Sequence, residues 1–223
     1  LLDARTLLYL ATDENGFGPW IYARDLERGD THRIFIGVEA YTSLAASENG
    51  RRLVATHARS TTNLWRVAIG DRVAGTGPAP IALPTTNGLS PRRGNGYLTY
   101  RSPKAGTVSL WKLPDRGSAI ELWNGVEGHV VAAPAIEPDG PRLAFAVRRS
   151  GRTQLFVMNA DGTESARRVT GDLDVRGAPA WSPDGRSLVV AAVVDHEPKL
   201  FKVPLDDGKP DLLVREEFAT NPI

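Results

Sequence analysis

Residues 178–185 read Ala-Pro-Ala-Trp-Ser-Pro-Asp-Gly, a short apolar segment that runs into a turn signal. Pro183 fixes its own φ and Gly185 readily takes a positive one, so this end of the stretch predicts a turn. The apolar run at 187–193 then has the length of a strand that is covered on both faces. Two more strand-like segments follow, at 199–204 and 211–215. We therefore expect 176–215 to form a four-stranded antiparallel meander.

The same unit recurs along the chain. The apolar pair that lies in its third strand begins at Ile21, Leu64, Leu110, Leu155 and Leu200, with successive spacings of 43, 46, 45 and 45 residues. The turn recurs independently, with its glycine at Gly50, Gly140 and Gly185 and a degraded copy at 94–96. One such meander cannot bury both of its faces, so the copies must stack on each other. The sequence therefore predicts an all-β fold, a β-propeller with five visible four-stranded blades.

The repeat boundaries predict a single propeller domain over 1–223. Its blades are expected at about 1–40, 41–87, 88–128, 129–174 and 175–220, with 221–223 starting or closing a blade. Two arrangements follow. The missing start Met and ends that fall inside a repeat favour an arc of a larger ring. Unpaired sheet edges at both ends of an arc would promote aggregation, which favours closure of a five-bladed ring by 221–223.

Composition narrows the classes of partner. The chain has 223 residues, with 27 Lys and Arg against 26 Asp and Glu, so no large net field attracts nucleic acid or an anionic membrane. It has no Cys, which excludes disulfides and thiolate metal sites. No apolar run reaches the length of a membrane span. We expect no nucleic-acid partner and no membrane insertion by this segment.

The motifs at 178–185 and at 155–162 (Leu-Phe-Val-Met-Asn-Ala-Asp-Gly) closely resemble the repeats of TolB-type, WD40-like bacterial β-propellers. The likeness is most faithful over 128–214 and weaker before Gly128. It implies a propeller fold and favours a periplasmic or extracytoplasmic location. The chain also resembles propeller domains of bacterial signalling proteins. The resemblance is specific for architecture, because folds of this kind host many activities.

Catalytic and metal-binding patterns are absent from the sequence. There is no Gly-x-Ser-x-Gly elbow, and the four His residues have no zinc spacing. The Asp-Gly pairs at Asp139, Asp161 and Asp184 do not continue into a calcium loop, and an Asp that accepts its own turn's N–H explains them. We expect no enzyme activity, no cofactor and no metal. Aromatic residues at one repeat position, Trp65 and Trp111 among them, are expected in the core between blades.

Basic residues follow the expected second strands, and two His residues lie in loops nearby. Alternate connections of a meander return to one edge of its sheet, so we expect these residues on one surface. They are His129, His196, Arg59, Lys104, Arg148 and Arg149. The sequence thus predicts a non-catalytic binding, sensing or scaffolding module of a larger bacterial protein, with a protein or peptide partner. The alternative is a propeller domain associated with a hydrolase or peptidase.

Overall fold

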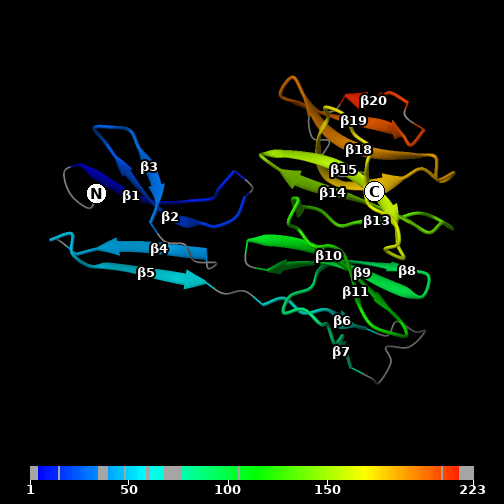
Figure 1. The fold of residues 1–223 in the computed structure, drawn as a ribbon, viewed down its shortest axis with the longest axis horizontal. Coiled ribbons are helices and arrows are strands. Elements are labelled where there is room, and N and C mark those ends of the chain that lie inside the picture. Colours follow the sequence, from blue (N-terminus) through cyan, green and yellow to red (C-terminus); the bar gives the residue numbers. More distant parts are fainter. Residues whose placement is uncertain are drawn as a thin grey trace. The chain divides into compact units, whose positions relative to one another are not determined.

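The computed structural model describes most of the chain. The described residues are 5–14, 16–34, 40–47, 49–58, 61–67, 77–104, 106–206 and 208–215. The chain divides into two compact units, unit 1 (Leu1–Thr61) and unit 2 (Thr62–Ile223). Over the described residues both units consist of antiparallel strands joined by turns and contain no helix (Figure 1). The all-β prediction is confirmed.

The described residues of unit 1 form two small sheets. The first has the order β1-β2-β3, and the second pairs β4 with β5. Their bounds are β1 Thr6–Ala11, β2 Trp20–Asp25, β3 Thr31–Arg33, β4 Ala40–Ala46 and β5 Leu53–Ala58. Trp20 and Ile21 at the start of β2 are buried, whereas Val54 in β5 is 70% exposed. The apolar core of this unit therefore forms mainly around β2.

Unit 2 holds a two-stranded hairpin and three larger sheets. The hairpin is β6 (Trp65–Arg66) with β7 (Ala79–Pro80). The first large sheet has the order β11-β10-β9-β8: β8 Leu89–Gly94, β9 Tyr97–Lys104, β10 Thr107–Pro114 and β11 Ile120–Trp123. The second has β12 His129–Val130 and β13 Ala135–Ile136, both paired with β14 Arg142–Arg149, then β15 Arg152–Asn159 and β16 Arg167–Arg168. The third has the order β17-β18-β19-β20: β17 Asp174–Trp181, β18 Ser187–Val194, β19 Glu197–Pro204 and β20 Asp211–Arg215.

The three large sheets repeat the same strand register. Leu110, Leu155 and Leu200 lie in the third strand of each meander, opposite Arg101, Ala146 and Ala191 respectively. These partners are themselves 45 residues apart. The spacing in the sequence therefore corresponds to one structural position in three successive sheets.

Neighbouring sheets pack face to face through apolar side chains of their middle strands. Buried residues of β14 and β15 meet those of β17, β18 and β19 in one core that includes Leu155, Val157, Leu188 and Val190. Between the first and second large sheets, Trp123 packs on Phe145 and Phe156, with ring centroids 5.6 and 5.4 Å apart. Because each meander buries a face on the next, the stacking expected of a propeller is present within unit 2.

Trp65 is 56% exposed, so its placement in the core was wrong, whereas Trp111 is half-buried. Trp65 lies in a two-residue strand whose sheet partner is β7. Within the described part of unit 2, its ring is not covered by a sheet with longer strands. Five blades of four strands stay a prediction, because the described residues before 81 form sheets of two or three strands. Residues 221–223, expected to start or close a blade, lie outside the described residues.

Candidate partner-binding edge

In each large sheet of unit 2, the first strand begins beside the end of the second strand. These points lie at one end of the strands, which is the edge of the sheet that carries the loops. His129 of β12 pairs with Arg148 of β14, and Asp174 of β17 pairs with Val193 of β18. The turns that lead from second to third strands lie at the same place, and those between β9 and β10 and between β14 and β15 point to one side of unit 2 (Figure 1). We call this the loop edge; of the predicted residues it carries Lys104, His129, Arg148, Arg149 and His196. Arg59 lies outside the described residues.

A tightly packed loop positions His129. The indole Nε1 of Trp123 donates a hydrogen bond to the carbonyl oxygen of Gly128, at 2.7 Å. Gly128 has a φ of +133°, and a Cβ at this position would lie 2.6 Å from Cγ1 of Val147. Only glycine therefore fits between the loop and the end of β14. His129 is half-buried and its Nδ1 is buried, so its ring is part of this packed structure.

Lys104 and Arg149 are the accessible cations of the loop edge. They end β9 and β14, lie 45 residues apart and are both exposed. Within the described part of the chain neither takes part in an ion pair. Arg148 differs, because it is half-buried and its Nε is buried. The two exposed cations are therefore the residues of this edge most available to an anionic partner.

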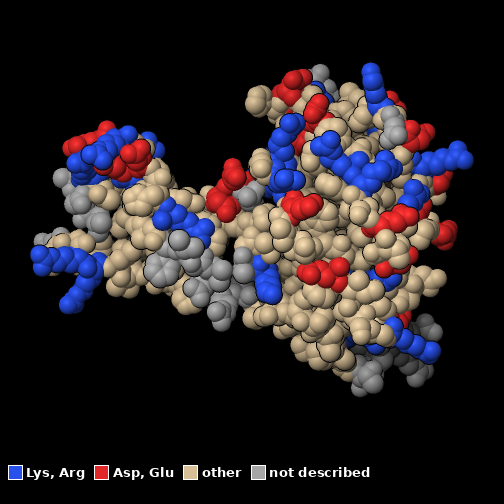
Figure 2. All heavy atoms as spheres, in the orientation of Figure 1, with Lys and Arg blue, Asp and Glu red and all other residues tan. Residues whose placement is uncertain are grey.

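Two neighbouring arginines at the loop edge, Arg152 and Arg176, are engaged within the protein. Nη2 of Arg152 donates to the carbonyl oxygen of Asp172 at 2.7 Å, and Nη2 of Arg176 lies 2.8 Å from Oδ2 of Asp174. Figure 2 shows basic and acidic side chains interspersed over the visible face of unit 2. Among the described residues of the loop edge, Lys104 and Arg149 therefore supply local positive charge.

His196 occupies a strained turn. It forms the β18–β19 turn with Asp195, and the φ angles are +65° and +54°. At the corresponding position the other two hairpins carry Gly106 and Gly151, with φ of +82° and +76°. A side chain in this left-handed region costs free energy, and such strain concentrates at functional positions. His196 is exposed, so its imidazole projects from the edge and burial of the side chain does not offset the free energy of the strained turn.

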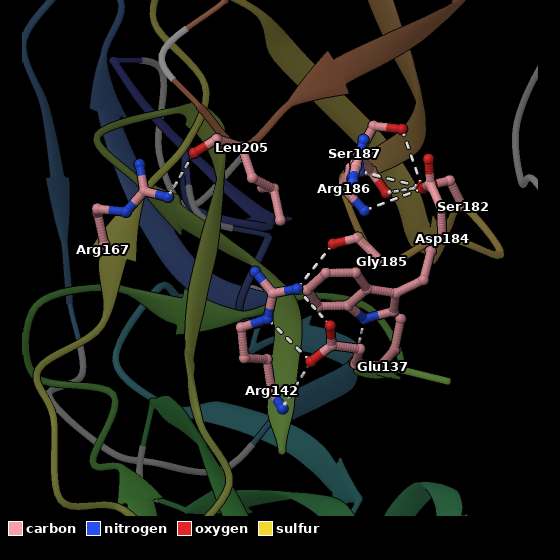
Figure 3. Close-up of polar contacts among 11 residues, drawn as sticks. Glu137, Arg142, Arg167, Ser182, Asp184, Gly185, Arg186, Ser187 and Leu205 are labelled. Atoms are coloured by element: carbon pink, nitrogen blue, oxygen red, sulfur yellow. Dashed lines mark hydrogen bonds and ion pairs between the residues drawn. The ribbon is translucent and has the colours of Figure 1, made fainter. Parts of the chain in front are cut away.

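Sequence reasoning missed a contact between sheets at the opposite edge, which we call the turn clamp (Figure 3). Arg142 forms an ion pair with Glu137 and donates from Nη2 to the carbonyl oxygen of Gly185 in the next sheet, at 2.7 Å. Its guanidinium lies 4.9 Å from the ring centroid of Trp181. Trp181 in turn donates from Nε1 to the carbonyl oxygen of Ala135, at 3.1 Å. Each of the two successive sheets therefore donates one side-chain hydrogen bond to a backbone carbonyl oxygen of the other.

The turn clamp packs closely against a glycine on each side. A Cβ at Gly140 would overlap the Glu137 carboxyl group, and a Cβ at Gly185 would lie 2.6 Å from Oε1 of Glu137. The Glu137 side chain is 8% exposed, and hydrogen bonds from Arg142 hold its pKa below the usual value. Glu137 and Arg142 replace the Ser182 and Ser187 of the next repeat, which is the signal in the sequence that could have revealed the clamp.

Asp161 and Asp184 accept hydrogen bonds from their own turns, as expected, whereas no such bond to Asp139 is found among the described residues. Oδ1 of Asp184 accepts from the N–H of Arg186 and from Oγ of Ser182, at 3.0 and 2.6 Å. Oδ1 of Asp161 accepts from the N–H of Thr163 at 2.9 Å. These bonds lower the pKa of both carboxyl groups. Among the described residues no group of three or more His, Asp or Glu side chains is placed to hold a metal ion.

A groove of about 1070 Å³ runs between the β6–β7 hairpin and the sheet of β8–β11. Trp65, Leu98 and Leu113 line its apolar wall. Arg93 and Asp115 stand at the groove as a bidentate ion pair, with Nη1 of Arg93 2.6 Å from Oδ1 of Asp115.

Within the described residues, no helix is long and apolar enough to cross a membrane.

Solved structures support the architecture. A putative TolB from Agrobacterium tumefaciens superimposes with a TM-score of 0.55 at 17% identity, covering 84% of this chain and 66% of that one. TolB from Acinetobacter baumannii gives a TM-score of 0.55 at 15% identity, covering 97% of this chain and 58% of that one. At these identities the likeness shows the fold alone.

Sequence comparison identifies the family. The Tol-Pal system protein TolB of Xylella fastidiosa is 32% identical over 80 residues, which are 35% of this chain. The match spans 18% of the length of that curated relative. The profile of the TolB beta propeller domain matches residues 75–222, about two thirds of the chain. The chain belongs to the TolB beta propeller domain family.

Proposed function

We propose that this chain is a non-catalytic protein-binding propeller module that takes an acidic segment of a partner protein at the loop edge. The observation that carries the proposal is the pair Lys104 and Arg149, two exposed cations without ion pairs among the described residues, at the same repeat position of neighbouring sheets. Charge of this kind contributes to specificity and to the rate of association.

Family membership supports a protein partner. The curated relatives are named as proteins of the Tol-Pal system, and a component of a multi-protein system works through other proteins. By the same likeness we propose a periplasmic or extracytoplasmic location and a place within a larger bacterial protein. No contact among the described residues supports a role in signalling or an association with a hydrolase or peptidase.

The strained turn at His196 adds a second contact to the proposed edge. A folded protein tolerates a histidine at a left-handed position more readily than most residues, yet glycine occupies that position in the other two hairpins. An exposed imidazole held in that turn can donate a hydrogen bond to a carboxylate. His129 has a different role in the proposal, because its half-buried ring shapes the start of the edge.

The test uses a fluorescein-labelled oligo-glutamate peptide and the folded chain, with fluorescence anisotropy as the readout. We expect the double variant Lys104→Glu/Arg149→Glu to lose binding while its melting temperature is unchanged, because both side chains are exposed. Binding by the parent protein should weaken as salt is added. An oligo-lysine peptide is the control for nonspecific attraction.

The matched control reverses the same charge at the opposite edge, in Arg116→Glu/Arg186→Glu. Both of these residues are exposed and lie in turns away from the loop edge. Equal loss of binding in both double variants would show that only net charge matters and would overturn the proposal. Reversal of Arg148 is avoided, because its half-buried side chain would disturb packing as well as charge.

A further inference from the structure

The chain carries five Asn-Gly pairs, at Asn15, Asn49, Asn87, Asn95 and Asn124. In such a pair the glycine amide nitrogen can attack the side-chain carbonyl carbon of the asparagine, because no Cβ stands in the way. We propose that Asn95 is a modification site, the position at which the folded protein converts asparagine to aspartate and isoaspartate. Asn15 lies outside the described residues, and the other four pairs differ in how their turns hold them.

The chemistry needs only water. The nitrogen of Gly96 forms a bond to Cγ of Asn95, the bond from Cγ to Nδ2 breaks, and ammonia leaves with the proton of the Gly96 amide. Water then opens the resulting succinimide at either of its two carbonyl carbons. One opening yields aspartate, and the other yields isoaspartate, whose main chain passes through the former side chain. Nothing is oxidised or reduced.

Asn87 is held against this reaction. Its Oδ1 accepts a hydrogen bond from the N–H of Thr62 at 3.0 Å, and its Nδ2 donates to the carbonyl oxygen of Pro103 at 3.4 Å. The attacking nitrogen is engaged too, because the N–H of Gly88 donates to the carbonyl oxygen of Thr62 at 2.9 Å. Three hydrogen bonds would have to open before this side chain and this nitrogen could meet.

Asn49 and Asn124 are held by their own turns. Oδ1 of Asn49 accepts from Oγ of Ser47 at 2.7 Å, and the N–H of Gly50 donates to the carbonyl oxygen of Ser47 at 2.9 Å. Oδ1 of Asn124 accepts from the N–H of Val126 at 3.0 Å. In both residues a hydrogen bond within the turn holds the side-chain carbonyl oxygen, so the rotation needed to bring Cγ to the glycine nitrogen is restrained.

Asn95 has none of these restraints. It forms the two-residue turn between β8 and β9 with Gly96, and both residues are exposed. Within the described residues neither the Asn95 side chain nor the Gly96 N–H takes part in a hydrogen bond. The space around Gly96 is open, since a Cβ built there would meet nothing within 4 Å. The structure thus singles out one of four chemically equivalent pairs.

The product would alter the rim of the groove beside β8–β10. Aspartate at this turn adds a negative charge two residues from Arg93, which already pairs with Asp115. Isoaspartate lengthens the main chain inside a turn that sets the pairing of Gly94 with Tyr97. The N–H of Asp115 also donates to the carbonyl oxygen of Gly96, so the change reaches both residues of the ion pair. This inference is independent of the proposed function.

The experiment follows the mass of each Asn-Gly peptide while the folded chain is incubated in mildly alkaline buffer. Conversion raises a peptide's mass by the difference between water and ammonia. Each hydrogen bond that must open should slow the reaction roughly fivefold, as expected for a bond of about 1 kcal/mol. We therefore expect the Asn95 peptide to convert at least severalfold faster than those of Asn49, Asn87 and Asn124.

Incubation in concentrated urea is the control, because there the four peptides should convert at similar rates. Asn95→Ser should abolish conversion at its own peptide and leave the others unchanged. If Asn49, Asn87 or Asn124 converts as fast as Asn95 in the folded protein, the inference is overturned. It is also overturned if the preference for Asn95 persists in urea, since the fold would then not be its cause.

Discussion

The sheets β12–β16 and β17–β20 are successive copies of one repeat, and they differ in an instructive way. Their interiors agree: Leu155 faces Ala146 in one as Leu200 faces Ala191 in the other, and five of the eight residues of β14 and of β18 are buried. Burial of apolar side chains at these positions defines the stack of sheets, so this part of the repeat tolerates little change.

Their turns disagree. Where the first copy has the ion pair of Glu137 and Arg142, the second has Ser182, whose Oγ accepts from the N–H of Ser187 at 3.0 Å. Where the first has Gly151, the second has His196. The difference teaches that the core of the repeat determines the architecture, whereas the turn residues determine how one sheet holds the next and which groups reach solvent.

The largest expected effect comes from the shared interior. Phe145 and Val190 are fully buried at equivalent positions, but Phe145 also stacks on Phe156 at 6.1 Å. Phe145→Ala should lower the free energy of unfolding by about 3 to 5 kcal/mol, and Val190→Ala by about 2 kcal/mol. The urea midpoints of the two variants check that Phe145→Ala costs more than Val190→Ala, provided that the slopes of their unfolding transitions equal that of the parent protein. Equal losses would contradict the expected contribution of the larger ring and of its aromatic contacts.

A smaller effect is expected at the turns. Glu137→Ala leaves Arg142 without its carboxylate, and it should cost about 2 kcal/mol, less than a fully buried pair because Arg142 is one third exposed. Ser182→Ala should cost about 1 kcal/mol for its lost hydrogen bonds. Both are measured by urea unfolding.

The control for the turn clamp is the exposed pair of Arg93 and Asp115. Their side chains are 58% and 44% exposed, and exposed pairs stabilise proteins little. Asp115→Ala should therefore leave the urea midpoint unchanged within error. If it destabilises the protein as much as Glu137→Ala does, the position of Glu137 between two sheets is not what makes its pair important.

The turn clamp also predicts a pH dependence. Because Arg142 lowers the pKa of Glu137 in the folded protein, the stabilisation is present above the ordinary pKa of 4.5 and is lost as pH falls through the lower folded value. The difference in unfolding free energy between the parent protein and Glu137→Gln should be constant at neutral pH and shrink below 4.5. Other lowered carboxyl groups, such as Asp161 and Asp184, titrate alike in both proteins and cancel. A difference that grows with acid would contradict the assignment.

Much of the fold could be predicted from the sequence, because the repeat period fixes the register. Leu110, Leu155 and Leu200 at regular spacing were enough to identify third strands, and the Pro-Asp-Gly turns separated first strands from second ones. Trp65 shows the limit. Its spacing marks the same position, but burial depends on whether neighbouring strands cover it, and that is not a local property of the sequence.

The candidate edge could be predicted only in part. The alternation of connections in a meander placed Lys104, His129 and Arg149 at one edge, as found. It did not distinguish the exposed Arg149 from the half-buried Arg148, because adjacent residues of a strand face opposite sides and the sequence alone did not say which side packs. The turn clamp was missed because Glu137 and Gly185 belong to different repeats.

One expected effect has the opposite sign and concerns His196. Replacing it by glycine should relieve the left-handed strain and raise the unfolding free energy by about 1 kcal/mol. The reciprocal change, Gly151→His, should cost about the same, since a Cβ at Gly151 would meet nothing within 4 Å and only the backbone is strained. If histidine is retained for contact with a partner, His196→Gly should weaken binding of the oligo-glutamate peptide even as it stabilises the protein. A variant that is less stable than the parent would show instead that the imidazole makes stabilising contacts of its own.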